Sequence, residues 1–349
     1  MSNFEEGDAP LGTTGPVRRK SVAVTSSSLI KTGCLPGGGA LPLVVEPTVR
    51  GVDLVTWAAS QREFIETNLH RHGGLLFRNF KVAGAPGFEQ FIEAVSGSTL
   101  EYRERSSPRS QVSGNIYTST DHPPNQSIFL HNENSYQHTW PLKIFFFCVT
   151  AATQGGETPI ADIRRIHDRI KPDTLERFRQ KQWMYLRNFG DGLGLPWETV
   201  FQTTDKAQVE RHCRDNAIEV EWKEGDRLRT RAVRPAIARH PRTGEMVWFN
   251  HATFFHVSTL DPMIRDVLLA TFSAEDLPTN TCYGDGSAIE PEVLDELREA
   301  YRQETVTFPW QEGDILLLDN MLAAHGRAPY SGARRILVGM AESWNNRGI

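Results

Sequence analysis

A histidine and a glutamate lie two residues apart in the run His131-Asn132-Glu133, and a second histidine, His325, follows far downstream. Two imidazoles and one carboxylate that meet in space form a facial ligand set for Fe(II), which leaves positions open for a co-substrate and O2. Residues i and i+2 of a strand face the same way, so His131 and Glu133 can bind one ion while Asn132 faces away. An apolar, strand-like run precedes each histidine.

This spacing is not specific by itself, because 11 histidines and 43 acidic residues produce such pairs by chance. A surface histidine beside a solvated glutamate is the simplest alternative. A zinc hydrolase can also use two histidines and a glutamate. The residues around the motif therefore have to decide between these interpretations.

Four blocks of sequence, two of which contain the candidate ligands, follow one another in a fixed order, at 73–80, 130–136, 155–162 and 313–325. With them the chain resembles the taurine dioxygenase (TauD/TfdA) family of Fe(II)- and 2-oxoglutarate-dependent oxygenases, from about residue 73 to residue 341. The resemblance implies a mainly β fold with helical insertions around a double-stranded β-helix (jelly roll) core. It also implies Fe(II), 2-oxoglutarate and O2, with His131, Glu133 and His325 as the metal ligands and catalytic residues.

The resemblance also assigns two residues to 2-oxoglutarate. The family holds the far carboxylate with a threonine of a Gly-Gly-x-Thr turn and an arginine about ten residues after the distal histidine, which correspond here to Thr158 and Arg335. A planar guanidinium binds a carboxylate through two charge-assisted hydrogen bonds. Arg335 leads into an apolar strand at 336–340, so we expect Arg335 to face inward and Arg334 to face the opposite way. A zinc hydrolase gives no reason for the Thr158 and Arg335 pair.

Two departures from the family pattern narrow the chemistry. The carboxylate ligand is Glu133, one methylene longer than the family's usual aspartate. Its presence argues against the halogenase variant, in which a small residue makes room for halide. Taurine dioxygenase carries a sulfonate-binding arginine four residues beyond the 2-oxoglutarate arginine, where this chain has Gly339. A taurine-like sulfonate substrate is therefore not expected.

Within the family, the chain is similar to the branch that includes the syringomycin-type aspartyl hydroxylase (SyrP-like), through segments at 117–120, 131–136, 145–148 and 248–256. That branch tailors amino acids or small acids for specialised metabolites, in some cases on a carrier protein. The resemblance implies hydroxylation of an unactivated C–H bond of an amino acid or small acid derivative. Desaturation, epoxidation or ring closure, for example to an aziridine, is one alternative, and a non-catalytic jelly-roll binding protein is another.

Substrate contacts are expected from polar and charged side chains of the predicted pocket wall. Arg103 and Arg105 lie two apart on a predicted strand and can face a substrate carboxylate together, although a solvated edge strand explains them equally well. His251 and His256 are alternatively core histidines, and Asp319 either orients a ligand histidine or closes a turn. The candidates are Arg103, Arg105, Asn115, Tyr117, Asn134, Tyr136, Asn250 and His251.

Composition excludes several classes of protein. The 349 residues carry a net charge of −5 with a pI of about 6.1, so the basic footprint of a nucleic-acid-binding protein is missing. The longest apolar run, 144–152, is far shorter than the ~20 residues that cross a bilayer, and the N-terminus lacks a secretory signal. Four scattered cysteines indicate reduced thiols and a cytoplasmic location. We expect a small-molecule substrate and no nucleic-acid or membrane partner, and an oligomer remains open.

Gly, Ser, Thr and Pro dominate residues 1–38, which predicts a flexible N-terminal tail. Residues 39–349 are expected to form a single oxygenase domain, with a polar, helix-prone insertion at about 163–230. Asp53 is expected to cap a helix that ends at Gly73, and Pro262 and Pro291 to open two later helices. Another helix is indicated by the apolar stripe Phe88, Phe91, Ile92 and Val95.

Overall fold

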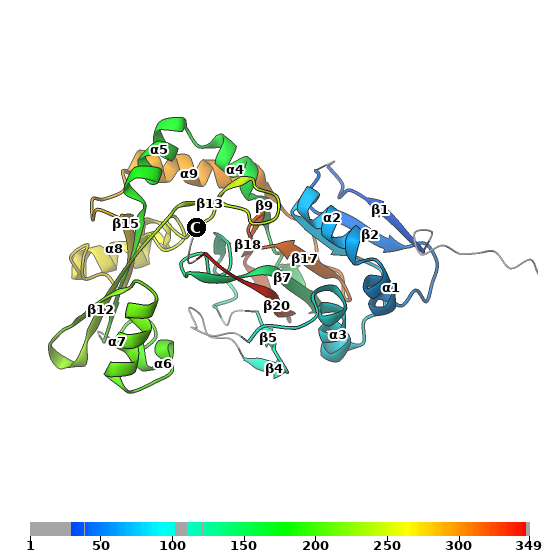
Figure 1. The fold of residues 1–349 in the computed structure, drawn as a ribbon, viewed down its shortest axis with the longest axis horizontal. Coiled ribbons are helices and arrows are strands. Elements are labelled where there is room, and N and C mark those ends of the chain that lie inside the picture. Colours follow the sequence, from blue (N-terminus) through cyan, green and yellow to red (C-terminus); the bar gives the residue numbers. More distant parts are fainter. Residues whose placement is uncertain (1–28, 38, 102–109, 120–121, 191, 347–349) are drawn as a thin grey trace, which may run out of the picture.

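Two β-sheets packed face to face form the centre of the computed structural model, which describes residues 29–37, 39–101, 110–119, 122–190 and 192–346 (Figure 1). Most of the predicted tail, residues 1–28 and 38, therefore lies outside the described residues, whereas its residues 30–33 form a strand of the larger sheet. The larger sheet has the order β1 (Ile30–Gly33), β2 (Leu43–Pro47), β3 (Gly74–Phe77), β17 (Ile315–Asp319), β7 (Thr139–Thr150), β20 (Arg335–Asn345), β5 (Ile116–Thr118) and β4 (Gln111–Ser113). The smaller sheet has the order β16 (Thr305–Val306), β9 (Ile160–Asp162), β18 (Ala323–Arg327) and β6 (Ile128–His131). This is the predicted jelly-roll core, antiparallel except where β2 pairs with β3.

Three helices cover the outer face of the larger sheet: α1 (Leu54–Ser60), α2 (Arg62–His72) and α3 (Gly84–Ser96). The apolar stripe of α3 is buried as predicted, and Phe88 stacks on Phe147 of β7 with ring centroids 5.3 Å apart. The expected single helix from Asp53 to Gly73 is instead two helices, because the backbone leaves the helical region at Gln61. Asp53 and Gly73 cap the two outer ends.

The central strands are buried on both faces, because helices cover one side of the larger sheet and the smaller sheet covers the other. On β7, Phe145 and Phe147 pack toward the helices. Phe146 and Cys148 pack between the two sheets, in a cluster with Ile336 of β20. Such strands are apolar in both alternating sets of side chains.

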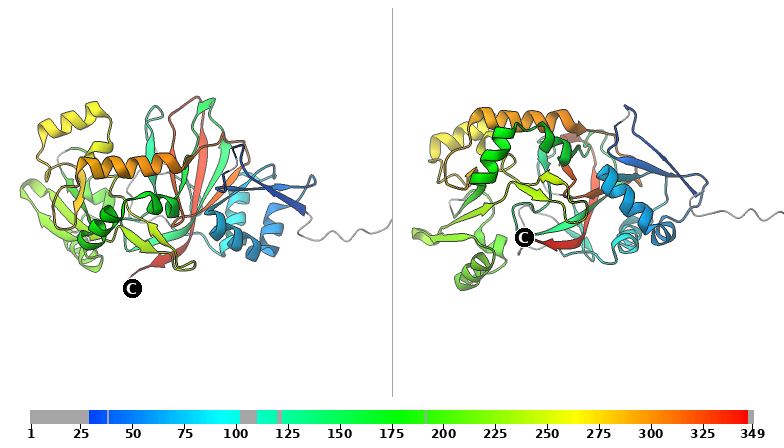
Figure 2. Two further views of the ribbon diagram at one scale, coloured as in Figure 1. Left: turned by 90° about the horizontal axis from the view of Figure 1, so that it is seen from above. Right: turned by 45° about the horizontal axis from the view of Figure 1, so that its top comes forward.

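A third sheet stands apart from the core at the opposite end of the molecule from α1–α3 (Figures 1 and 2). Its order is β11 (Glu219–Trp222), β12 (Leu228–Arg234), β10 (Trp183–Phe189) and β15 (Thr279–Tyr283). The helices α6 (Trp197–Phe201) and α7 (Lys206–Asp215) pack on it through a small apolar cluster. Most of this sheet comes from the predicted insertion, and β15 completes it from beyond residue 230.

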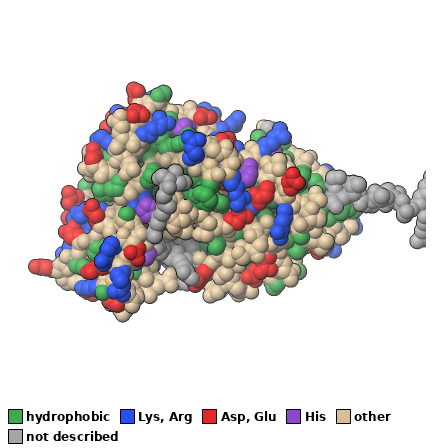
Figure 3. Space-filling view, viewed as in Figure 1, with side chains coloured by type: hydrophobic (Ala, Val, Ile, Leu, Met, Phe, Trp, Pro, Cys, Tyr) green, Lys and Arg blue, Asp and Glu red, His purple; other side chains and the backbone are tan. Residues whose placement is uncertain are grey.

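The remaining elements connect the sheets. The predicted prolines open α8 (Pro262–Thr271) and α9 (Pro291–Glu304). The others are α4 (Ile163–Arg169), α5 (Pro172–Lys181), β8 (Gln154–Gly155), β13 (Ile237–Arg239), β14 (Met246–Trp248), β19 (Tyr330–Ser331) and the 3-10 turns at Glu224–Asp226 and Val257–Thr259. Among the described helices, none combines the length and the apolarity that a membrane crossing requires. Basic and acidic side chains are interspersed on the face drawn in Figure 3.

Candidate metal centre and its cavity

The smaller sheet brings together the two histidines of the predicted triad. His131 ends β6, His325 lies on the neighbouring β18, and the two residues are paired across the ladder. Each of His131, Glu133 and His325 offers a ligand atom, and these atoms all lie within 4.8 Å of one another. Nε2 of His325 is 3.8 Å from a carboxylate oxygen of Glu133. Nitrogen and oxygen donors grouped in this way fit a divalent metal such as Fe(II).

Glu133 does not lie on the strand, as the i, i+2 argument predicted, but in the turn that follows β6. The side-chain amide of Asn320 holds its backbone there. Oδ1 of Asn320 accepts from the N–H of Glu133 at 2.7 Å, and its Nδ2 donates to the carbonyl of Glu133 at 2.9 Å. Asn132 in turn donates to the carbonyl of Asn320 at 2.6 Å. Asn320 therefore positions the carboxylate ligand, a role that the sequence analysis missed.

The two imidazoles are oriented by the chain around them. Nδ1 of His131 lies 2.9 Å from the carbonyl oxygen of Phe129. In the tautomer with its proton on Nδ1, this contact is a hydrogen bond and Nε2 is the metal donor. Phe254 packs on His131 and Phe146 on His325, with ring centroids 4.7 Å and 5.0 Å apart. These aromatic rings restrict the orientations of both ligands.

A cavity of about 400 Å³, here called the metal cavity, opens beside the triad. Its lining includes both ligand histidines, Thr158 and Arg334. Thr158 is buried, and its hydroxyl oxygen accepts a hydrogen bond from Nε1 of Trp310 at 3.2 Å. The cavity thus has metal donors at one place and a hydroxyl and a guanidinium at another, as recognition of a chelating dicarboxylate requires.

Arg334, and not Arg335, lines the metal cavity, so the predicted orientation of this pair is wrong. Arg335 is exposed at the start of β20. Arg334 shares its face with Ile336 and Val338, which also line the cavity. The apolar run after Arg335 did not indicate which of the two arginines faces the cavity, because both faces of β20 are buried. A register shift against β7 between Arg335 and Ile336 also interrupts the pairing at this point.

Arg334 is half-buried, and its surroundings change its pKa. Its Nε donates to the carbonyl of Gly156 at 2.8 Å, and its Nη1 to the hydroxyl of Ser119 at 3.3 Å. Burial, with a smaller contribution from nearby Arg327, lowers the pKa of Arg334 to about 10. Burial also lowers the pKa of Arg327, whose guanidinium donates to backbone carbonyls. Two desolvated cations at one wall favour an anionic ligand.

Because Arg334 lies where Arg335 was predicted to lie, the position that corresponds to the sulfonate arginine of taurine dioxygenase also shifts by one residue. Counting four residues from Arg334 gives Val338, which lines the metal cavity. Gly339 instead faces α3, where an added Cβ would lie 2.4 Å from Cδ1 of Ile92. A taurine-like sulfonate substrate is still not expected, since neither Val338 nor Gly339 can bind a sulfonate through a charge.

The predicted substrate residues divide into several groups. Arg103 and Arg105 lie outside the described residues. Asn115 donates to the hydroxyl of Thr99 at 3.2 Å, and Asn250 donates to a carbonyl and accepts from Ala252 in its own turn. These two asparagines are therefore engaged in local structure. Tyr117 is buried in the apolar cluster between the two sheets.

His251, Tyr136 and Asn134 lie next to the triad. The His251 ring is 5.7 Å from that of His131, and its Nδ1 is 2.6 Å from the hydroxyl of Ser135. Burial, followed by the nearby His131, holds the pKa of His251 well below its ordinary value, so the ring is neutral at pH 7. The Tyr136 hydroxyl lies 3.4 Å from Oδ1 of Asn134. Of these residues, Tyr136 borders a second cleft, away from the metal cavity.

The remaining predicted polar residues have structural partners. Asp319 accepts from the backbone of Met321 and Leu322 and lies 3.1 Å from His240. Asp319 therefore closes the turn after β17, which is the second of its two predicted roles. Nδ1 of His256 contacts the hydroxyl of Ser258 at 2.6 Å in the 3-10 turn.

Comparison with known proteins places the chain in a family. The family described as "Taurine catabolism dioxygenase TauD, TfdA family" matches residues 38–341. The dapdiamide synthesis protein DdaC of Enterobacter agglomerans is 40% identical over 309 residues, which cover 85% of this chain and 94% of DdaC. A clavaminate synthase-like protein of Arabidopsis thaliana is 29% identical over 293 residues, 81% of this chain and 86% of that protein.

Solved structures share the fold. PvcB of Pseudomonas aeruginosa has a TM-score of 0.58 at 16% sequence identity, with 93% of this chain and 97% of PvcB covered. PvcB is described as an Fe, alpha-ketoglutarate-dependent oxygenase from an isonitrile synthetic pathway. The family match spans most of the chain and includes every residue of the triad. The chain therefore belongs to the TauD/TfdA family and is an Fe(II)- and 2-oxoglutarate-dependent dioxygenase.

Proposed function

We propose that this enzyme hydroxylates an unactivated C–H bond of an amino acid or small acid derivative in the biosynthesis of a specialised metabolite. The observation that carries the proposal is the metal cavity, in which His131 and His325 share one lining with Thr158 and Arg334. The 40% identity to a dapdiamide synthesis protein supports the specialised-metabolite context.

The residues take separate roles in this proposal. His131, Glu133 and His325 hold Fe(II), and Arg334 binds the far carboxylate of 2-oxoglutarate with help from Thr158. The bound iron and 2-oxoglutarate supply the oxidising power, through oxidative decarboxylation of the co-substrate by O2. Because Thr158 already accepts from Trp310, its own hydroxyl proton is available to the carboxylate. Phe146 and Phe254 keep water from the two imidazoles.

The outcome at the substrate carbon depends on which carbon lies beside the metal. Desaturation, epoxidation or ring closure uses the same ligands and stays the alternative. A carrier-bound substrate and an oligomeric enzyme are compatible with the proposal. We also propose a single oxygenase domain over 39–349, preceded by a flexible tail. The four free cysteines, Cys34, Cys148, Cys213 and Cys282, support a reducing, cytoplasmic location.

The test is anaerobic addition of Fe(II) and 2-oxoglutarate to the metal-free protein. We expect the weak visible charge-transfer band of iron-bound 2-oxoglutarate. His131→Ala and His325→Ala are expected to lose the band, because each variant removes one of the three metal ligands. His72→Ala, which changes a histidine outside the triad, should keep it.

Each outcome decides between the candidates. A band in the wild type that His131→Ala removes supports the proposal, and succinate formation with candidate amino acids then identifies the substrate. Folded protein without a band favours the non-catalytic jelly-roll binding protein. A band that survives in His325→Ala contradicts the assignment of the triad.

A further inference from the structure

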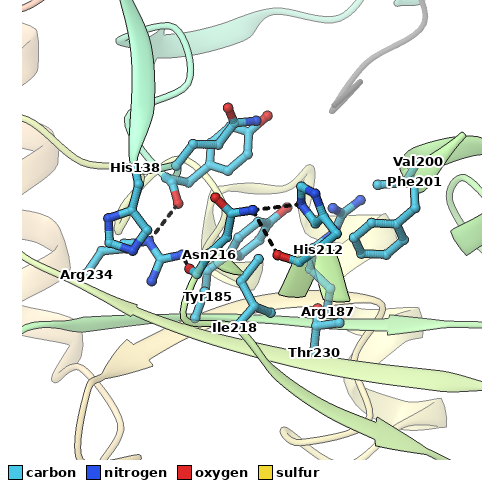
Figure 4. A pocket seen from close by; sticks show the side chains of 13 residues that line it. His138, Tyr185, Arg187, Val200, Phe201, His212, Asn216, Ile218, Thr230 and Arg234 are labelled. Atoms are coloured by element: carbon cyan, nitrogen blue, oxygen red, sulfur yellow. Dashed lines mark hydrogen bonds between the residues drawn. The ribbon is translucent and has the colours of Figure 1, made fainter. Parts of the chain in front are cut away.

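A second cleft, here called the Arg187 cleft, lies between the third sheet, α7 and the loop after Glu133 (Figure 4). It holds about 570 Å³ of space that is partly open to solvent. Its 13 lining residues include two arginines and two histidines but no aspartate or glutamate. In Figure 4, His138 and Arg234 lie at one end of the cleft and Val200 and Phe201 at the other. Arg187 and His212 lie on the side of Val200 and Phe201, so cationic and apolar side chains lie next to each other there.

Arg187 is a cation of this cleft that has no counter-ion among the described residues. It is half-buried on β10, and its guanidinium lies over the rings of Tyr185 and Phe189, 5.5 Å and 4.6 Å from their centroids. Within the described part of the chain, its guanidinium forms no ion pair and no hydrogen bond. Its neighbour Arg229 pairs with Asp276, and Arg231 pairs with Glu221. Stacking fixes the plane of the guanidinium while its N–H edge remains able to bind.

A second donor points to the same ligand. Nε2 of Gln137 is buried and has no hydrogen-bond partner among the described residues, although Gln137 lines the cleft. A buried amide without a partner is costly, unless a ligand satisfies it. The Asn216 amide is already directed to His212 and stays on the wall. Ile218 and Val200 supply apolar contacts for an aliphatic group.

The Arg187 cleft is separate from the metal cavity. Tyr136 forms the partition, because its ring contacts His251 at 5.1 Å on one side and Tyr185 at 5.6 Å on the other. His251 in turn lies against His131. The linings of the Arg187 cleft and the metal cavity share no residue. A ligand in the cleft therefore does not reach the metal ligands directly.

We propose that the Arg187 cleft is a second binding site, for a small organic carboxylate with a short apolar body. Arg187 binds the carboxylate through its N–H edge, Gln137 rotates its buried amide to donate to the same group, and Val200 and Ile218 pack on the body. A carboxylate suits this site because a planar guanidinium edge matches its two oxygens. The site is additional to the 2-oxoglutarate site at Arg334.

The test uses the full chain, with butyrate as the probe and butan-1-ol as its uncharged analogue. Saturation-transfer NMR measures the binding of each. It is run with and without Zn(II) and 2-oxoglutarate, which occupy the metal cavity. The wild type should bind butyrate saturably in both conditions and should not bind butan-1-ol. Arg187→Gln should weaken binding at least about tenfold, because charge-assisted hydrogen bonds are lost. Arg231→Gln, which removes one charge from the neighbouring strand, and Arg334→Gln should leave binding unchanged.

The outcomes separate this site from the proposed function. Butyrate binding that Arg334→Gln abolishes, or that Zn(II) and 2-oxoglutarate displace, places the anion in the metal cavity and overturns the proposal. Unchanged binding in Arg187→Gln, or no binding to the wild type, also overturns it. If Arg187→Gln fails to fold, methyl resonances of Ile218 and Val200 in the wild type replace it. Butyrate must shift both, and unshifted methyl resonances contradict the site.

Discussion

Arg334 carries the electrostatic character of the metal cavity. Its guanidinium has only uncharged partners in the described structure, a carbonyl of Gly156 and the hydroxyl of Ser119. A half-buried cation with neutral partners retains an attraction for an incoming carboxylate. We therefore expect Arg334 to control the affinity for the dicarboxylate co-substrate.

The adjacent arginines provide a matched pair of substitutions. Arg334→Gln should raise the dissociation constant of 2-oxoglutarate about 10- to 100-fold, because hydrogen bonds to charged groups contribute roughly 1.5–3 kcal/mol. Arg335→Gln removes the same charge from an exposed position and should change the constant less than about twofold. Anaerobic titration of the charge-transfer band measures both. The reverse ranking would return the role to Arg335.

Among the elements, β20 determines the shape of the site, because its two faces serve different layers. Ile336 and Val338 line the metal cavity, whereas Leu337 and Gly339 face the helices on the outer side. Gly339 allows close approach of α3, since an added Cβ would lie 2.4 Å from Cδ1 of Ile92 and 3.2 Å from Cδ1 of Ile116. Both isoleucines are fully buried.

Gly339→Ala should therefore destabilise the fold by about 1–3 kcal/mol, as overpacking of a filled core does. Gly33→Ala is the control, because an added Cβ meets nothing within 4 Å there. It should change the free energy of unfolding by less than about 0.5 kcal/mol. Urea denaturation compares the two variants with the wild type. Equal stability of Gly339→Ala and Gly33→Ala would mean that Ile92 rotates away without cost.

For the whole molecule, a buried ion network joins four distant segments. Lys143 of β7 contacts Glu66 of α2 and donates to Glu342 of β20 at 2.6 Å. Arg242, in the turn between β13 and β14, contacts the same two carboxylates. The Lys143 side chain is 1% exposed. The network therefore fastens the N-terminal helices, both central strands and the β13–β14 hairpin to one another.

Lys143→Met should lower the free energy of unfolding by about 3 kcal/mol, at the low end for a broken buried ion pair because both carboxylates keep some solvent contact. Lys31→Met is the control. Lys31 pairs with Glu46 at 3.2 Å but is 63% exposed, and its loss should cost under about 1 kcal/mol. Urea denaturation at neutral pH measures both. A loss below about 1 kcal/mol in Lys143→Met would show that the network contributes little.

The same network predicts a pH dependence. Burial, the largest single influence, raises the pKa of Glu342, but the hydrogen bonds and charges of Lys143 and Arg242 together outweigh it and lower the net pKa. A carboxyl group with a lowered folded pKa stabilises the protein above its unfolded pKa and loses that contribution as the pH falls through the folded value. The wild type should therefore lose stability below about pH 4.5. Lys143→Met should show a shallower loss, and an equal slope in both proteins would contradict the coupling.

Much of this molecule follows from local sequence patterns. The stripe of α3 and the helix-opening prolines were predicted because period and residue type are local properties. The jelly-roll class and the assignment of the triad were implied by the resemblance to the TauD/TfdA family. The boundary at Gln61 was missed, since nothing in the apolar spacing distinguishes one helix from two consecutive ones.

Other features depend on contacts between distant segments. Asn320 reaches Glu133 across 187 positions, and this contact, not strand alternation, places the carboxylate ligand. Arg187 faces a basic cleft only because α7 and the loop after Glu133 pack beside β10.

The sequence by itself determined which chemistry the chain carries, because ligand types and their order belong to the chain. The tertiary structure alone decided which of the two arginines lines the metal cavity. Alternation along β20 separates two sets of side chains, but both sets are buried. Only the layers that cover the strand, helices on one side and the smaller sheet on the other, tell that Arg334 faces the cavity and Arg335 faces solvent.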